Sequence, residues 1–316
     1  MDFIGQAPIL ERFRNEIIND KLGHAYAFTG EKGIGKRTLA HYIAKTILCI
    51  GKDNDIRPCG NCRSCRGIEE DINPYFKVIR SETRKILIKQ IRELIEDISI
   101  RPAEGRKVYL IEEADLMTID AQNCLLKTLE EPPTYGIILL TTSVFESLLL
   151  TIRSRIVQHR LKPYSVEDIR SISKINGIDI TGKEYLISLS GGIPGRIFEL
   201  AADKSFEENR IMIMKFVFEG DTHSKLELNQ YLSKNRNVFS SCMDILESVY
   251  RDALLAQCSL TDGLINSDKK DNIIKYAKGL TPLDIFEKIS GIQEIRSNLK
   301  RYMNYQLAVD MLTLTT

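Results

Sequence analysis

The stretch that decides the fold is Gly30-Glu31-Lys32-Gly33-Ile34-Gly35-Lys36, a glycine-rich loop of the form G-x-x-x-x-G-K. The run from His24 to Thr29 before it predicts a strand, and the helical spacing of apolar residues from Leu39 to Leu48 after it predicts a helix. In this order, backbone N–H groups and a helix N-terminus can cradle a phosphate. The loop predicts an ATP or ADP site that includes Gly30, Gly33, Gly35 and Lys36.

The alternation of strands and helices continues on both sides of this loop. Helical spacing covers residues 6–20, 88–98 and 116–131, and strands are expected near 76–79, 107–111, 137–142 and 156–159. Such alternation predicts a mainly parallel sheet covered on both faces, because parallel strands need long crossovers. From about Pro163 the pattern becomes helical, first in short segments and then, after Ser205, in longer ones. We therefore expect an α/β domain at 1–162, a small helical domain at 163–205 and a helical bundle at 206–316.

Composition excludes several classes of protein. Among 316 residues, 44 are Lys or Arg and 43 are Asp or Glu, so a net charge of +1 argues against a stand-alone nucleic-acid binder. No run of apolar residues is long enough to span a membrane. The N-terminus lacks the charged and apolar regions of a secretory signal, which predicts a cytoplasmic location.

The phosphate loop lacks the usual magnesium ligands. The residue after the loop lysine should carry a hydroxyl group, but it is Arg37, and Thr38 comes one position late, rotated by about 100° on the helix. The strand from Val108 to Ile111 ends in Glu112 and Glu113, where a magnesium-binding Asp followed by a water-polarising Glu is typical of P-loop ATPases. Either nucleotide binds here without efficient hydrolysis, or the loop keeps its shape only for packing.

Four cysteines predict a metal site. Cys59, Cys62 and Cys65 form C-x-x-C-x-x-C, and Cys49 precedes them by ten positions. Four thiolates can surround a structural zinc ion tetrahedrally and leave no open position for catalysis. A redox pair would need only two cysteines, and a four-iron cluster is disfavoured because the flanking ferredoxin pattern is absent.

An arginine stands just before the final strand of the α/β domain. In Thr151-Ile152-Arg153-Ser154-Arg155, the last residue is expected at a domain edge, from which it could reach a phosphate on a neighbouring subunit. The simpler interpretation is a solvated arginine or a local ion pair.

Taken together, these motifs resemble bacterial clamp-loader subunits of the AAA+ class. The resemblance also includes the residues 24–26 (H-A-Y), 108–115 and 123–133 (N-C-L-L-K-T-L-E-E-P-P), and it extends to about residue 200. It implies an AAA+ domain, a lid at 163–205 and an oligomerising collar at 206–316. The family's Ser-Arg-Cys motif appears as Ser154-Arg155-Ile156, and Arg196 stands in the lid motif whose arginine senses nucleotide in motor subunits.

The resemblance also implies a function. It favours a non-motor (stator) subunit of the DNA polymerase III clamp loader, without independent ATPase activity. Its partners would be the gamma/tau motor subunits and the delta subunit, and through the complex the sliding clamp and primed DNA. Arg155 would act on the neighbour's nucleotide. The alternatives are an autonomous AAA+ ATPase of the motor type and a zinc-dependent DNA-binding module.

Overall fold

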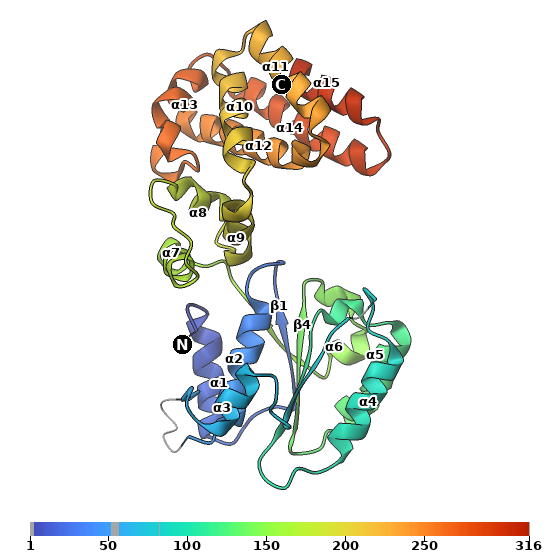
Figure 1. Ribbon diagram of the computed structural model, residues 1–316. Coiled ribbons are helices and arrows are strands. Elements are labelled where there is room, and N and C mark those ends of the chain that lie inside the picture. Colours follow the sequence, from blue (N-terminus) through green and yellow to red (C-terminus); the bar gives the residue numbers. More distant parts are fainter. Residues whose placement is uncertain (1–2, 52–56, 82, 316) are drawn as a thin grey trace. The chain divides into compact units, whose positions relative to one another are not determined.

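The computed structural model describes residues 3–51, 57–81 and 83–315 (Figure 1). The chain forms two compact units. The first comprises residues 1–172 and 192–195, and the second comprises residues 173–191 and 196–316. Among the described residues, none of the helices is both long and apolar enough to cross a membrane.

The first unit is built on a parallel sheet with the strand order β2-β3-β4-β1-β5. Its strands are β1 (Ala25–Thr29), β2 (Phe76–Ile79), β3 (Lys107–Ile111), β4 (Gly136–Thr142) and β5 (Val157–Arg160). The three central strands β1, β3 and β4 are buried throughout. This burial on both faces explains why their sequences are mostly apolar and do not alternate with polar residues. The predicted parallel α/β fold is confirmed.

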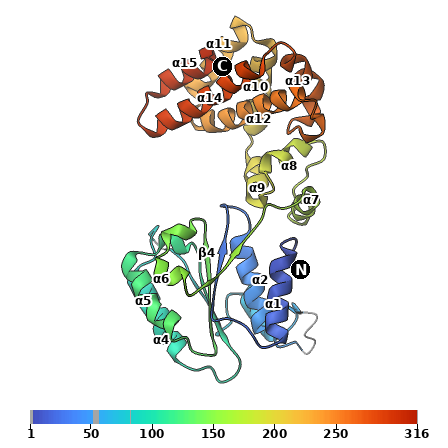
Figure 2. The same cartoon turned by 180° about the vertical axis from the view of Figure 1, so that it is seen from behind.

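Helices cover both faces of this sheet. They are α1 (Ala7–Ile18), α2 (Lys36–Leu48), α3 (Arg63–Glu69), α4 (Ile88–Ser99), α5 (Ile119–Glu130) and α6 (Leu150–Arg153). Figures 1 and 2 show α1 and α2 on one face and α4, α5 and α6 on the other. The core of the second face joins apolar residues of α4 and α5 to strand residues such as Tyr109 and Ile138.

Two local features differ from the sequence expectations. The helix expected at 116–131 begins at Ile119, because Ala114–Leu116 form a 3₁₀ turn and Thr118 Oγ1 accepts a hydrogen bond from the Ala121 N–H at 3.3 Å. Helix α3, which the sequence analysis did not predict, begins inside the cysteine motif with Cys62 as its N-cap.

Beyond β5 the chain is helical, as expected. The helices are α7 (Val166–Ile175), α8 (Glu184–Ser190), α9 (Pro194–Ala202), α10 (Phe206–Glu219), α11 (Thr222–Lys234), α12 (Phe239–Gln257), α13 (Lys270–Ala277), α14 (Pro282–Lys300) and α15 (Tyr305–Thr315). Helix α12 carries buried residues on most of its faces, since α10, α13 and α14 all pack against it. It is therefore the centre of the helical unit.

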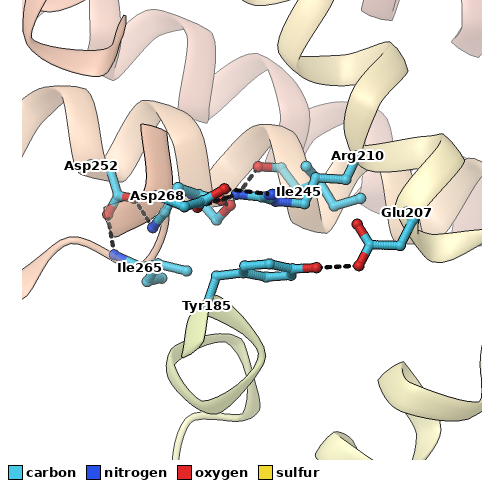
Figure 3. Close-up of polar contacts among 9 residues, drawn as sticks. Tyr185, Glu207, Arg210, Ile245, Asp252, Ile265 and Asp268 are labelled. Atoms are coloured by element: carbon cyan, nitrogen blue, oxygen red, sulfur yellow. Dashed lines mark hydrogen bonds and ion pairs between the residues drawn. The ribbon is translucent and has the colours of Figure 1, made fainter. Parts of the chain in front are cut away.

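A polar cluster around the buried Arg210 joins α8 to the helices that follow it (Figure 3). Arg210 of α10 lies with its guanidinium 3.8 Å from the ring centroid of Tyr185 in α8, and it donates two hydrogen bonds to Asp268, at 2.6 and 3.0 Å. Tyr185 donates its hydroxyl to Glu207. The Arg210 side chain is 7% exposed, so this buried cation is held by a ring face and by a carboxylate that is itself 36% exposed.

Candidate functional site

The phosphate loop follows β1 and leads into α2, as the motif predicts. Gly33 and Gly35 have φ values of 84° and 95°, a left-handed region that side chains other than glycine rarely adopt. The Gly195 N–H donates a hydrogen bond to Gly33 O at 2.9 Å, and a Cβ atom built on Gly195 would lie 2.6 Å from Gly33 Cα. The glycine at 195 is therefore required for the close contact between this segment and the loop.

Lys36 bonds to the loop itself. Its ammonium group donates to Gly30 O at 2.7 Å, to Glu31 O at 2.9 Å and to Ser143 Oγ at 2.9 Å. Burial lowers the pKa of Lys36, while the carboxylates of Asp115, Glu113 and Glu31 oppose that shift. The three donors of the ammonium group are thus matched by three acceptors.

Glu112, at the end of β3, is surrounded by cationic and imidazole side chains. Arg37 Nε lies 3.0 Å from Glu112 Oε1, His41 Nε2 lies 3.5 Å from the same oxygen, and Arg80 Nε lies 3.2 Å from Oε2. Burial alone would raise the pKa of Glu112, but the hydrogen bond with His41 and the charges of Arg37 and Arg80 hold it below its ordinary value. Glu112 is therefore a carboxylate, and both of its oxygens have partners.

These residues do not fit a magnesium ion. Arg37 stands where a hydroxyl ligand is usual, and its guanidinium has no lone pair to offer a metal. It lies instead against the carboxylate that would share the ion. Thr38 is exposed on α2, and Glu113, also exposed, follows β3 with a φ of 52° and donates its N–H to Thr141 Oγ1 at 3.0 Å. The loop is preserved, but the metal positions are not.

Arg155 lies two residues after the end of α6 and is partly exposed to solvent. Its Nη2 lies 3.0 Å from Glu130 Oε1 at the end of α5, and its Nη1 donates to Thr151 O at 2.9 Å and to Ser154 Oγ at 3.2 Å. The Arg155 side chain is 36% exposed and that of Glu130 is 51% exposed. The guanidinium is thus held by a solvent-accessible ion pair.

Arg196, predicted as a nucleotide sensor, belongs to the second unit. It lies exposed near the start of α9, with its guanidinium beside Gly191. Its role as a sensor stays a prediction.

The four predicted cysteine ligands come together. The Sγ atoms of Cys49, Cys59, Cys62 and Cys65 all lie within 4.8 Å of one another. A tetrahedral zinc site with Zn–S bonds of about 2.3 Å needs sulfur atoms about 3.8 Å apart, which small movements would supply. Backbone N–H groups point at the sulfurs, from Cys62 to Cys59 Sγ and from Cys65 to Cys62 Sγ, each at 3.4 Å. Such donors favour thiolates, so the residues fit a zinc ion.

Three side chains around the loop were missed in the sequence analysis. Ser143 follows β4, which pairs with β1, and Arg80 follows β2, which pairs with β3. His41 lies on α2, five residues after the loop lysine. The signal that could have found Ser143 and Arg80 is their position at the carboxyl ends of parallel strands, where sites in such sheets gather.

Family models match both parts of the chain. Residues 5–165 match the model described as "DNA polymerase III, delta subunit", and residues 208–315 match "DNA polymerase III, delta subunit, C terminal". The chain is 30% identical to the DNA polymerase III subunit delta′ of Bacillus subtilis over 319 aligned positions, covering 98% of this chain and 95% of that protein.

The chain is also similar to gamma and tau subunits of DNA polymerase III. The gamma subunit of Buchnera aphidicola subsp. Baizongia pistaciae is 28% identical over 338 residues, which covers 98% of this chain and 86% of that subunit. The tau subunit of Escherichia coli is 37% identical over 171 residues, which is 54% of this chain and 26% of the tau subunit. Among solved structures, a gamma-subunit-related protein of Thermotoga maritima covers 97% of this chain and 98% of its own, with 16% identity and a TM-score of 0.42.

Proposed function

The chain belongs to the delta′ family of bacterial DNA polymerase III clamp-loader subunits, and on this basis we propose that it is the non-motor (stator) subunit of its loader. It assembles with gamma/tau motor subunits and a delta subunit and helps to load the sliding clamp onto primed DNA in the cytoplasm. Residues 163–205 act as a lid domain, and the helices at 206–316 act as a collar that holds the subunits together.

The observation that carries the stator assignment is a contrast within the first unit. Arg37 and Glu112 form an ion pair at the two positions that would bind magnesium, which removes the metal needed for hydrolysis. Arg155 is partly exposed in the same unit. The chain thus lacks the usual magnesium ligands at its own phosphate loop and presents an arginine that can act on a neighbour's nucleotide.

Arg155 is proposed as an arginine finger. In the assembled loader its guanidinium leaves Glu130 and contacts the triphosphate of the adjacent motor subunit, where it stabilises the charge that develops during transfer. The exchange is feasible because the Arg155–Glu130 pair is exposed to solvent, and such pairs are weak.

Reconstitution with motor and delta subunits tests this function. We expect Arg155→Ala to leave assembly intact and to lower the ATPase rate at the adjacent site by about tenfold or more. Arg92→Ala, which removes an exposed arginine from α4, is the matched control. Unchanged hydrolysis at full assembly would refute the finger. Rapid magnesium-dependent hydrolysis by the chain alone would instead favour an autonomous ATPase.

We also propose that the four cysteines hold a structural zinc ion. The ion would join the end of α2, at Cys49, to the start of α3, and it would supply no catalytic step because four thiolates fill its coordination sphere.

Metal removal tests this site. Elemental analysis is expected to find about one zinc per chain, and a strong chelator or Cys65→Ser is expected to lower the melting temperature. Cys258→Ser, at an exposed cysteine outside the cluster, is the control and should have little effect. A metal-free preparation with an unchanged melting temperature would exclude the zinc.

A further inference from the structure

The Arg37–Glu112 contact joins the two positions that hold magnesium in P-loop ATPases. In those enzymes a hydroxyl from the helix after the loop and a carboxylate at the end of another strand of the sheet share the ion. Here the two positions touch directly, with Arg37 Nε 3.0 Å from Glu112 Oε1. The helix and the strand are therefore linked without a metal.

Both oxygens of the Glu112 carboxylate already have partners. Glu112 Oε1 contacts Arg37 and His41 from α2, and Oε2 contacts Arg80, which follows β2. Its side chain is only 11% exposed. A divalent cation would have to displace at least one of these contacts and would also meet the repulsion of two guanidinium charges.

The lysine beside this pair is also engaged. Lys36 donates to Gly30 O, Glu31 O and Ser143 Oγ, so its charge is held within the loop. Asp115, one of the carboxylates near this lysine, accepts from the Ser143 N–H at 3.2 Å. The loop, α2 and the ends of β3 and β4 are thus connected by the chain's own side chains.

We infer that Arg37 is a built-in replacement for magnesium. Its guanidinium supplies the positive charge between α2 and β3 that the metal supplies in an active site. Because the cation is covalently attached, the site keeps its shape at any magnesium concentration and excludes the ion. This inference concerns the isolated chain and does not depend on a trans-acting Arg155.

Thermal unfolding of the isolated chain tests the inference. The melting temperature is measured with ADP and added magnesium, and again with ADP in a magnesium-free buffer that contains no chelator, so that the proposed zinc ion stays in place. For the wild type we expect the same melting temperature in both conditions. The double variant Arg37→Thr/Glu112→Asp restores a hydroxyl and the shorter carboxylate, and we expect magnesium with ADP to raise its melting temperature.

Two further variants keep the test decisive. Arg37→Thr alone retains Glu112 and should also respond to magnesium with ADP, so it serves if the double variant does not fold. Arg80→Gln removes the other guanidinium but leaves the Arg37–Glu112 pair, and it should not respond. A magnesium-dependent rise for the wild type, or no rise for either folded Arg37 variant, would overturn the inference.

Discussion

The two compact units each contain a charged cluster, and the two clusters are built in opposite ways. In the first unit one carboxylate, Glu112, is surrounded by Arg37, Arg80 and His41. In the second unit one guanidinium, that of Arg210, lies between the ring of Tyr185 and the carboxylate of Asp268 (Figure 3). The side chains of Arg37 and Arg80 are 62% and 44% exposed, whereas that of Arg210 is 7% exposed.

The two clusters therefore differ in which group is shielded from solvent. In the Glu112 cluster the carboxylate is the shielded group, at 11% exposure, and its two arginine partners are more exposed than it is. A buried guanidinium such as that of Arg210 cannot leave its partners without becoming an unpaired charge in the protein interior. Glu112 therefore depends on Arg37, Arg80 and His41 to remain charged, whereas Arg210 joins α8 and α10 to Asp268.

The largest effect is expected from Arg210→Met. Loss of the guanidinium removes its hydrogen bonds to Asp268 and to the buried Asn266 and the cation over the Tyr185 ring, and we expect a loss of about 3 kcal/mol of stability. Urea unfolding followed by circular dichroism measures the loss of stability. Hydrogen exchange of the α8 amides measures whether α8 is less protected in the variant. Arg251→Met is the control, because Arg251 is 49% exposed and its partner Asp252 also accepts from the backbone N–H groups of Ile265 and Asn266. Unchanged protection of α8 would contradict the role of Arg210.

An intermediate, pH-dependent effect is expected from Glu112→Gln. The pKa of Glu112 is lowered in the folded chain, so its contribution is present above the unfolded pKa and is lost as the pH falls through the folded pKa. We expect the variant to be less stable by about 1 to 3 kcal/mol at neutral pH. The gap should begin to narrow as the pH falls below about 4.3, the pKa of an unfolded glutamate, and should close only below the lower folded pKa. Urea unfolding of both proteins across this range measures the gap. A gap that is constant with pH would show that the charge of Glu112 contributes nothing.

The smallest effect on stability is expected from Glu130→Gln. The Arg155–Glu130 pair is exposed on both sides, so its loss should change stability by less than about 0.5 kcal/mol. Urea unfolding of the variant beside Arg210→Met gives the comparison directly. A loss as large as that of Arg210→Met would mean that Arg155 is a structural arginine, and a finger that must leave Glu130 would then be ruled out.

Much of the fold and part of the site could be predicted from local sequence. The G-x-x-x-x-G-K loop and the buried runs of β1, β3 and β4 specify strand, loop and helix, and the spacing of Cys59, Cys62 and Cys65 specifies a cluster. These signals are local, because each one depends on residues that are close together in the sequence.

The contacts that complete the site are long-range and could not be predicted in this way. Arg80 reaches Glu112 only because β2 pairs with β3, and Ser143 reaches Lys36 only because β4 lies beside β1. Strand order follows from packing of the whole sheet. Likewise, the contact of Gly195 with Gly33 joins residues far apart in the chain. The Arg210 cluster gave no motif at all, since its members are spread over α8, α10 and the turn before α13.

The most direct test of the account compares two variants in one assay. Motor subunits are reconstituted with the delta subunit and with wild-type chain, Arg155→Ala or Lys36→Ala, and ATP hydrolysis is measured at equal assembly. The account predicts that Lys36→Ala supports hydrolysis as well as the wild type, while Arg155→Ala lowers it by about tenfold or more at the adjacent site. Loss of hydrolysis with Lys36→Ala, and full activity with Arg155→Ala, would contradict it.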